Sequence, residues 1–235
     1  MRGGLFSKAL ELLFPARCPF CRSVSDPDYL EEHGICPECG KTVFQFKEAD
    51  ELPHGALSCV LKLYVPFRYT GEVKKAMLRY KFGGENWLAE PFARLLYEYL
   101  RKNGATDDAE LITFVPVSAR RLAVRGYDQS ALIAKKVGEL SGLPVRSLLM
   151  RTDRKSTSEL NLEERKSRKR FEIKTPGTEL ANMRILLIDD IFTTGSTLTE
   201  CAKLLLEHGA GAVDAACMCS GRQDIYGLSG KGLTA

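Results

Sequence analysis

The sequence predicts an α/β protein in which helices flank a parallel sheet and a small N-terminal module carries four cysteines. Three observations lead to this fold class. Strand-like and helical segments alternate from residue 111 onward, two Cys-x-x-Cys pairs lie near the N-terminus, and an aliphatic run at 185–188 meets two acids. Strands that alternate with helices are typical of a parallel sheet covered on both faces, and ligands of such sheets bind at the carboxyl ends of the strands.

The composition fits one large core with a small module attached. The chain has 235 residues, of which 44% are hydrophobic and 27% charged, and a chain of this length buries a sizeable core. The apolar stretch LFSKALELLFP contains Lys8 and Glu11 and lacks a small-residue cleavage site, so it predicts an amphipathic helix rather than a secretory signal. No apolar run reaches the roughly 18 residues of a membrane span. We therefore expect a cytoplasmic protein with no membrane span.

The excess positive charge is concentrated in one segment. The formal net charge is +4, and residues 150–170 hold eight Lys and Arg against four Asp and Glu, which leaves 26 of each sign elsewhere. Such a segment suits an anionic ligand or nucleic acid, but it is also typical of a solvated helix face. Charge alone leaves both interpretations open.

Two cysteine pairs form the first motif. Cys18 and Cys21 are followed after 14 residues by Cys36 and Cys39. Each pair can form a tight knuckle that aims both sulfurs at one tetrahedral ion. Redox dithiols are the alternative, but nothing around these pairs resembles the strand and helix of a redox site. The spacing predicts a structural zinc site, in which the metal supplies most of the folding energy of a segment that has almost no core.

The acidic, turn-rich stretch EADELPHGALS at 48–58 is interpreted as a linker. It divides the chain into an N-terminal helix and zinc-ribbon module, residues 1–55, and a second domain, residues 56–235. Residues 61–69 alternate in polarity and predict a half-buried strand, which Pro66 places at a sheet edge. Residues 87–101 carry Leu, Phe and Tyr at helical spacing and predict a core helix.

Further along the chain, four segments are interpreted as strands and two as helices. The strands are expected at 111–117, 145–150, 184–189 and 212–220, and the helices at 129–140 and 196–208. Short apolar runs of this kind are typical of strands buried on both faces. Cys201, Cys217 and Cys219 fall inside these elements and are expected to be small buried side chains.

The stretch ILLIDDIFTTGST at 185–197 predicts a ligand site. A buried strand is expected to end at Asp189 and Asp190, and the chain then turns into a helix through Thr193, Thr194, Gly195, Ser196 and Thr197. The N–H groups at a helix start bind phosphate, glycine allows close backbone approach, and hydroxyls add hydrogen bonds. The carboxylates can accept from sugar hydroxyls, so a phosphorylated ribose fits both groups. The alternative is an ordinary capped helix after a strand.

These thirteen residues resemble the phosphoribosyl-pyrophosphate (PRPP) motif of type I phosphoribosyltransferases. The resemblance continues in VPVSARRLAVRGYDQSALIAKKVGELSGLPV at 115–145, in AMLRYKFGGE at 76–85 and in the cysteine pairs after LFPARC. In this order the segments resemble the ComF family of competence-related proteins over nearly the full chain. The resemblance implies a type I phosphoribosyltransferase domain with an N-terminal zinc ribbon.

The resemblance also implies residue roles. Asp189 and Asp190 would bind the ribose hydroxyls at the catalytic site, and residues 193–197 the 5-phosphate. Ser118, Arg120 and Arg121 stand where such enzymes hold pyrophosphate with Mg²⁺, and a basic surface turn is the alternative interpretation. Residues 151–170 stand where such enzymes carry a flexible lid. Lys81 and Arg184 are further cations near these segments, and no role is assigned to them.

Two positions depart from the expected patterns. Purine-salvage members place an acid where Thr193 stands, and a hydroxyl is a poor group for exchanging a proton with a base. The ComF pattern has a glutamine where this chain has Thr157, and an asparagine where it has Arg168. Both departures concern the acceptor and the lid, and neither touches the residues that would hold the sugar phosphate.

Three functions follow from these observations. The first is a phosphoribosyltransferase of unknown acceptor that releases pyrophosphate and acts in DNA uptake. The second is a non-catalytic module that binds PRPP and single-stranded DNA. In the third, the zinc ribbon docks a partner such as a competence helicase, so that Cys36→Ser would abolish partner binding and leave PRPP affinity intact.

Overall fold

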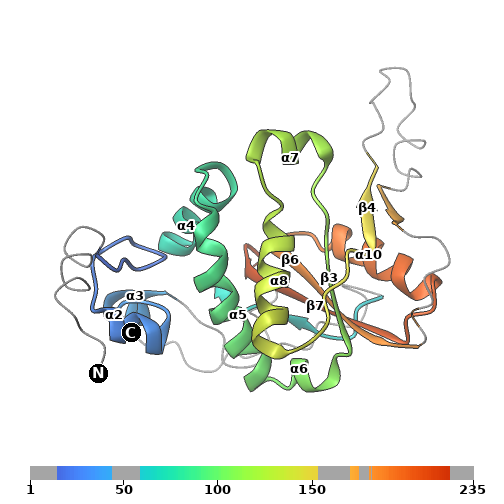
Figure 1. Ribbon diagram of the computed structural model, residues 1–235, viewed down its shortest axis with the longest axis horizontal. Helices are drawn as coiled ribbons and strands as arrows, with labels where there is room; N and C mark the ends of the chain where they lie inside the picture. The colour runs from blue at the N-terminus through green and yellow to red at the C-terminus, as the bar shows by residue number, and fades with distance from the viewer. Residues whose placement is uncertain (1–14, 44–58, 153–169, 175–179, 181, 223–235) are drawn as a thin grey trace.

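The computed structural model describes residues 15–43, 59–152, 170–174, 180 and 182–222 (Figure 1). The expected N-terminal helix, the expected linker and residues 153–169 of the expected lid therefore lie outside the described residues. The boundary between the two expected domains falls in the same undescribed stretch and stays a prediction.

The centre of the fold is a five-stranded parallel sheet. Its strands run in the order β1, β7, β6, β3, and β2 also pairs with β7. Their bounds are Leu63–Tyr64 for β1, Phe67–Arg68 for β2, Leu111–Phe114 for β3, Arg184–Phe192 for β6 and Ala212–Ser220 for β7. The register pairs Leu187 with Ala215 in β7 and Thr113 with Leu187 from the other side. The aliphatic run of β6 is thus buried in the middle of the sheet.

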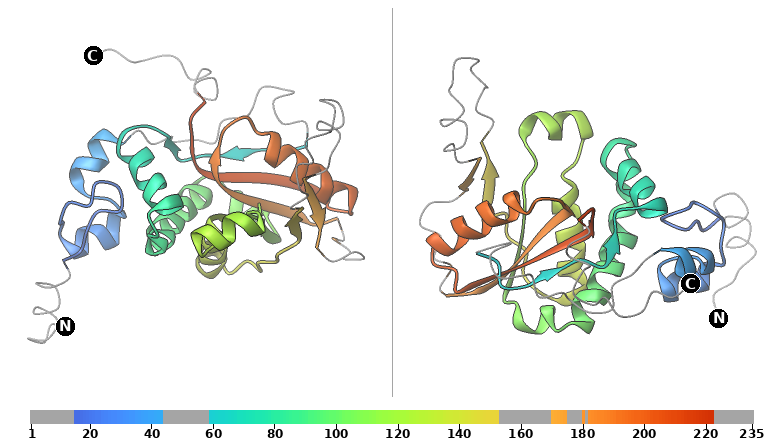
Figure 2. Two further views of the ribbon diagram at one scale, coloured as in Figure 1. Left: turned by 90° about the horizontal axis from the view of Figure 1, so that it is seen from above. Right: turned by 180° about the vertical axis from the view of Figure 1, so that it is seen from behind.

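Helices cover both faces of this sheet, as expected (Figure 2). On one face α4, α5 and α8 share a hydrophobic cluster with Leu186 and Ile188, and on the other α10 packs against Ile185 and Leu187. The helices are α4 (Gly71–Phe82), α5 (Ala89–Lys102), α8 (Gln129–Ser141) and α10 (Ser196–Glu207). Alternate residues of a strand point to opposite faces, so one aliphatic run supplies both clusters.

Shorter elements complete the described structure. They are α2 (Pro27–His33), α3 (Pro37–Thr42), the 3₁₀ helix η1 (Asn86–Leu88), α6 (Ala105–Asp108), α7 (Ala119–Arg125), β4 (Leu149–Arg151) and β5 (Phe171–Ile173). Strands β4 and β5 form a separate antiparallel pair. No helix in the described ranges is long and apolar enough to cross a bilayer.

The expected strand at 145–150 does not join the central sheet. Val145 makes only an isolated bridge to Ile112, and the Thr113 hydroxyl then donates to Arg146 O at 2.9 Å and accepts from Leu148 N–H at 3.5 Å. These side-chain hydrogen bonds replace the ladder, because a hydroxyl competes with backbone pairing. The chain leaves β3 and pairs with β5 instead.

Three other expectations need correction. The edge strand expected at 61–69 lies at the edge, but its outward residue Tyr64 is fully buried and Leu61 is 62% exposed. Strand β6 does not end at the two acids and continues to Phe192. The turn expected at Ser118 is the start of helix α7. By contrast, Cys201, Cys217 and Cys219 are buried as expected.

Candidate functional site

Asp189 is the sixth of the nine residues of β6 and is held by two donors. Its Oδ1 accepts hydrogen bonds from Ser130 Oγ at 3.0 Å and from the Asp190 backbone N–H at 2.9 Å. Ser130 belongs to the first turn of α8, and the packing of α8 against β6 brings its hydroxyl to the strand. The orientation of the Asp189 carboxyl group is therefore fixed by two secondary-structure elements.

Asp190 pairs with a lysine from a distant helix. Lys81 Nζ, in the last turn of α4, lies 2.9 Å from Asp190 Oδ1. Asp190 is only 8% exposed, and a carboxylate with so little access to water needs a partner. The pair therefore explains how a charged residue is tolerated in this strand.

Asp189 has a raised proton affinity. Burial, followed by the charge of Asp190, raises the pKa of Asp189 from 3.8 to about 7, against the lowering effect of the hydrogen bonds from Asp190 N–H and Ser130. Burial also raises the pKa of Asp128, which lies near the same charge. A perturbed carboxyl group beside a charged partner is typical of functional sites.

The loop after β6 leads into α10 with exposed hydroxyls. Thr193, Thr194 and Ser196 are exposed, and Thr197 is half-buried. Gly195 is the N-cap residue of α10 and has φ 79°, a left-handed conformation that favours glycine. Thr194 Oγ1 accepts a hydrogen bond from the Ser196 backbone N–H at 3.4 Å. The helix start thus presents hydroxyls and N–H groups at the surface, which is the chemistry that binds a phosphate.

One further cation lies beside this loop. Arg170, directly before β5, donates from Nη2 to Ser196 O at 3.3 Å. The Arg170 Nε donates to Glu200 Oε2 at 2.7 Å, and the Arg170 backbone N–H donates to Glu200 Oε1 at 2.5 Å. The basic composition of residues 150–170 indicated positive charge, but only the structure shows that Arg170 reaches the start of α10.

Helix α7 carries the three residues expected to hold pyrophosphate. Ser118 caps it, since its Oγ accepts from Arg121 N–H at 3.3 Å, and Gly126 ends it in a left-handed conformation. A cleft of about 560 Å³ lies beside this helix. Its lining residues are Phe82, Ser118, Arg120, Arg121, Val124, Arg125, Arg151 and Thr152. Among the described residues, four arginines and no acid line this cleft, so it is suited to an anion.

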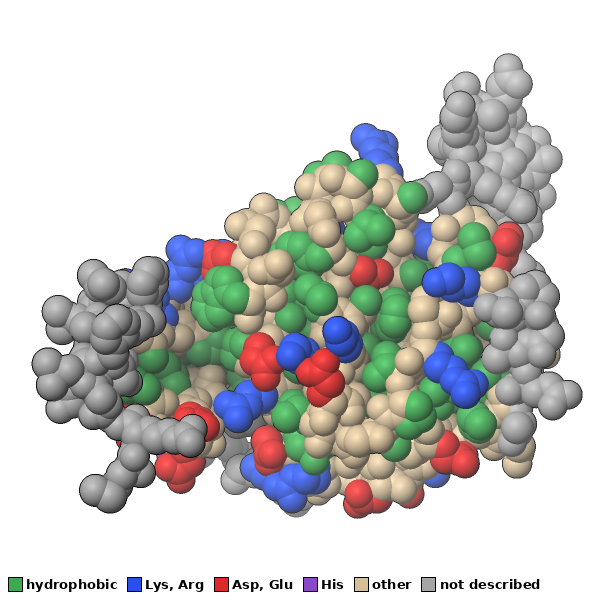
Figure 3. All heavy atoms as spheres, in the orientation of Figure 1, with side chains coloured by type: hydrophobic (Ala, Val, Ile, Leu, Met, Phe, Trp, Pro, Cys, Tyr) green, Lys and Arg blue, Asp and Glu red, His purple; other side chains and the backbone are tan. Residues whose placement is uncertain are grey.

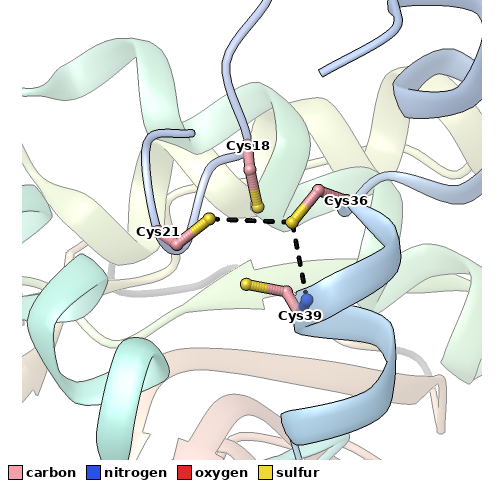
Figure 4. Close-up of side chains that lie close together, drawn as sticks. All are labelled: Cys18, Cys21, Cys36 and Cys39. Atoms are coloured by element: carbon pink, nitrogen blue, oxygen red, sulfur yellow. Dashed lines mark hydrogen bonds between the residues drawn. The ribbon is translucent and has the colours of Figure 1, made fainter. Parts of the chain in front are cut away.

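The four predicted zinc ligands converge on one point (Figure 4). Cys18 and Cys21 come from a loop, whereas Cys36 and Cys39 stand at the start of α3, and all four sulfurs lie within 4.8 Å of one another. A tetrahedral zinc ion with bonds of about 2.3 Å separates its sulfur ligands by about 3.8 Å. Burial raises the pKa of the Cys18 and Cys39 thiols, whereas at Cys21 hydrogen bonds outweigh the effect of burial and lower the pKa to about 7. The cluster is compatible with structural zinc.

The structure brings the predicted residues together in separate groups. Asp189 and Asp190 share one strand–loop–helix unit with residues 193–197, while the α7 residues line a cleft whose wall includes none of that unit. Sequence analysis missed Ser130 and assigned no role to Lys81. Arg184 lies at the opposite end of β6, where it binds Asp214 at 3.0 Å, so it takes no part in the site.

Comparison with known proteins identifies the family. Residues 112–228 match the phosphoribosyl transferase domain family. The competence protein ComFC of Streptococcus pneumoniae is 32% identical, over 74% of this chain and 76% of that protein. The DNA utilization protein YhgH of Salmonella typhimurium is 28% identical, over 88% of this chain and 98% of that protein.

Likeness to solved structures is looser. The purine phosphoribosyltransferase from Pyrococcus horikoshii is 19% identical, covers 57% of this chain and 73% of its own, and has a TM-score of 0.38. The family match agrees with the parallel sheet and the flanking helices described above. The chain belongs to the ComF family, and it has the type I phosphoribosyltransferase fold behind a four-cysteine module.

Proposed function

We propose that this protein binds PRPP with Mg²⁺ at the β6–α10 unit and transfers its phosphoribosyl group to an acceptor with release of pyrophosphate. Relatives named as competence and DNA utilization proteins support a role in DNA uptake. A structural zinc ion at the four cysteines completes the proposal. The acceptor is left open, because Thr193 offers no acid to a purine base.

One observation carries this proposal. Asp189 and Asp190 stand three and two residues before the end of β6, and the same chain then presents the exposed hydroxyls of the loop and the start of α10. Carboxylates accept hydrogen bonds from sugar hydroxyls, and a helix start binds phosphate. A pentose 5-phosphate carries both groups at a distance fixed by its ring.

The pair between Lys81 and Asp190 is compatible with ribose binding. Lys81 binds Oδ1, and we assign Oδ2 to the sugar hydroxyls. Lys81 would therefore hold the Asp190 carboxyl group in place while its other oxygen accepts hydrogen bonds from the sugar.

In this proposal the chain contributes mainly positioning and charge. Residues 193–197 fix the 5-phosphate, the two acids fix the ribose ring, and the arginines of α7 neutralise the pyrophosphate as it leaves. Mg²⁺, when bound with PRPP, neutralises the phosphate oxygens further. Only the cysteines gather three or more metal-binding side chains in the described ranges. This fits Mg²⁺, which prefers substrate phosphates plus one or two carboxylates.

Calorimetric titration with PRPP tests the proposal. We expect wild-type protein to bind PRPP in the presence of Mg²⁺ and Asp190→Asn to lose most of this affinity, since an amide replaces the acceptor charge. Asp107→Asn, a matching change at an exposed position on α6, should bind like wild type. Pyrophosphate release with candidate acceptors, DNA included, then separates transfer from binding alone. Equal affinity in wild type and Asp190→Asn would contradict the proposed site.

A second candidate function is a non-catalytic module that binds PRPP and single-stranded DNA. The arginine-lined cleft favours it, because Phe82 is 69% exposed beside the cleft and the Arg125 guanidinium lies 4.8 Å from its ring centre. Figure 3 shows hydrophobic and basic side chains close together near the top of the molecule as drawn. Arginines that track phosphates beside an exposed aromatic ring are typical of single-strand binding.

Salt dependence tests this second function. Each phosphate contact made by a basic side chain lowers the logarithm of the affinity by about 0.7 per tenfold rise in salt for single strands. We expect a steep slope in wild type that becomes shallower in Arg121→Gln. Phe82→Ala should weaken binding at every salt concentration without changing the slope. A competence helicase that docks on the four-cysteine module remains a third proposal.

A further inference from the structure

Helix α4 lies between the four-cysteine module and the sheet (Figure 1). Residues on a helix are spaced by about 100°, so Arg79 and Lys81 point in nearly opposite directions. Arg79 contacts the module, and Lys81 contacts Asp190. The two candidate sites are therefore joined by two residues of one rigid element.

At one end, Arg79 binds the backbone of the first cysteine knuckle. Its Nη2 donates to Pro19 O at 2.8 Å and to Phe20 O at 2.9 Å, both between Cys18 and Cys21. Its Nε donates to Glu85 Oε2 at 3.3 Å, and Glu85 also pairs with Arg22, just after the knuckle. The Arg79 side chain is 18% exposed, so the loss of its acceptors would be costly.

The knuckle also inserts an aromatic side chain into the core. Phe20 is fully buried. Its ring packs edge-on against Phe67 of β2, with 5.3 Å between ring centres, and stacks on Phe92 of α5 at 5.9 Å. Phe92 in turn packs edge-on against Tyr80 at 5.4 Å, between Arg79 and Lys81. The position of the knuckle and the position of α4 are thus linked by packing and by hydrogen bonds.

At the other end, the last turn of α4 is anchored close to the acids. Tyr80 OH donates to Gln129 O at 2.8 Å, and Tyr127 OH donates to Tyr80 O. Gln129 begins α8, whose next residue, Ser130, binds Asp189. A shift of this turn would therefore change the surroundings of both acids.

A metal ion at the four cysteines would hold the shape of the knuckle. Its described backbone hydrogen bonds are few, among them Cys18 N–H to Ser23 O at 3.0 Å and Arg22 N–H to Cys18 O at 2.9 Å. Structural zinc supplies much of the folding energy of such small segments. Without metal, the carbonyl groups that bind Arg79 would lose the geometry seen here.

We propose that α4 couples metal binding at the four cysteines to the acids of β6, with Arg79 as the contact at the knuckle and Lys81 as the residue that positions Asp190. The effect on PRPP affinity rests on the proposed function, but the mechanical coupling does not. This inference contradicts a pure docking role for the module, under which PRPP affinity would not depend on the cysteines.

Hydrogen exchange of the full chain, with bound metal and after chelation, tests the coupling. We expect chelation to speed exchange in peptides covering 76–85 and 190–197 while α8 stays protected. Arg79→Gln with its metal still bound should reproduce this change. Arg94→Gln, an exposed change of the same type on α5, should not. PRPP affinity should fall about tenfold in the chelated wild type and in metal-loaded Arg79→Gln, which is within the usual range of coupling between sites.

The outcomes separate the coupling from the proposed function. Unchanged exchange at 190–197 after confirmed loss of metal would overturn the coupling, whether or not PRPP binds. If chelation unfolds the whole chain, the test is made with metal-loaded Arg79→Gln instead. Hydrogen exchange at 190–197 equal to that of Arg94→Gln would then overturn the coupling. If exchange responds but no sample binds PRPP, the coupling stands and the proposed function fails.

Discussion

Lys81 Nζ lies 2.9 Å from Asp190 Oδ1, and this contact joins the last turn of α4 to the acidic end of β6. The two residues are far apart in sequence but have little exposed side-chain surface, 18% for Lys81 and 12% for Asp190. A pair so shielded from water is less screened by salt than a surface pair. Its loss should therefore be measurable in stability as well as in ligand binding.

Removal of Lys81 should destabilise the fold by leaving a carboxylate without its partner. We expect Lys81→Met to lower the free energy of unfolding by about 1–3 kcal/mol in urea titrations. Lys75→Met, on an exposed position of the same helix, should change it by less than about 0.5 kcal/mol. The double variant Lys81→Met/Asp190→Asn should recover part of the loss. A double variant with purely additive effects would argue against a direct interaction.

Asp189 should make stability depend on pH. Because the pKa of Asp189 is about 7 in the folded protein and near 3.8 without the fold, the folded state holds a proton that the unfolded chain releases. Its contribution to stability is complete below pH 3.8 and is lost as the pH rises to about 7. Urea titrations between pH 4 and 8 should show a shallower decline in Asp189→Asn than in wild type. Asp107→Asn should keep the wild-type slope.

Ser130→Ala should move this transition upward. The Ser130 hydroxyl lowers the pKa of Asp189 by donating to the charged carboxylate, so its removal favours the protonated form. The pH midpoint of the stability change should rise above that of wild type. A midpoint that stays in place would show that this hydrogen bond has no effect on the proton affinity of Asp189.

Gly195 and Gly142 form a matched pair for testing the phosphate loop. Their φ angles are 79° and 76°, and Cβ strain in this region costs about 1–2 kcal/mol. Each change to Ala should therefore lower stability by a similar amount. Only Gly195→Ala should also weaken binding of PRPP and of inorganic phosphate in calorimetry, because Gly142 ends α8 on a different element. Equal binding in both variants would separate this loop from phosphate recognition.

Arg121 should contribute to anion binding in the cleft of α7. We expect Arg121→Gln to weaken pyrophosphate binding about tenfold, the value of one hydrogen bond to a charged group. Arg94→Gln lies outside this cleft and should bind pyrophosphate like wild type. Calorimetry at two salt concentrations distinguishes a specific contact from general attraction, since screening weakens the latter far more.

The elements that could be predicted are those encoded by local pattern. The aliphatic run at 185–188 predicted β6, the mostly apolar run at 212–220 predicted β7, and helical spacing of Leu, Phe and Tyr predicted α5. The cysteine spacing predicted that the four thiol groups would lie together. Each of these signals lies within a short window, where periodicity and side-chain chemistry are sufficient.

What could not be predicted depends on tertiary pairing. Ser130 meets Asp189 across 59 positions of sequence, and Lys81 meets Asp190 only because α4 packs beside the sheet. The path of the chain after β3 was also missed, because one hydroxyl, that of Thr113, replaces the expected ladder. Helix α7 carries local capping signals in Ser118 and Gly126, so closer attention to caps would have found it.

The burial of Phe20 between Phe67 and Phe92 limits how this protein can be divided or recombined. A shortened chain starting at residue 59 would lack Phe20, which would leave a cavity beside Phe67 and Phe92. The apolar surface exposed there would favour aggregation. A chimera that borrows another protein's cysteine segment would need a large aromatic residue at the same knuckle position. Substitutions at Phe20 should therefore occur together with substitutions at its contact positions in β2 and α5.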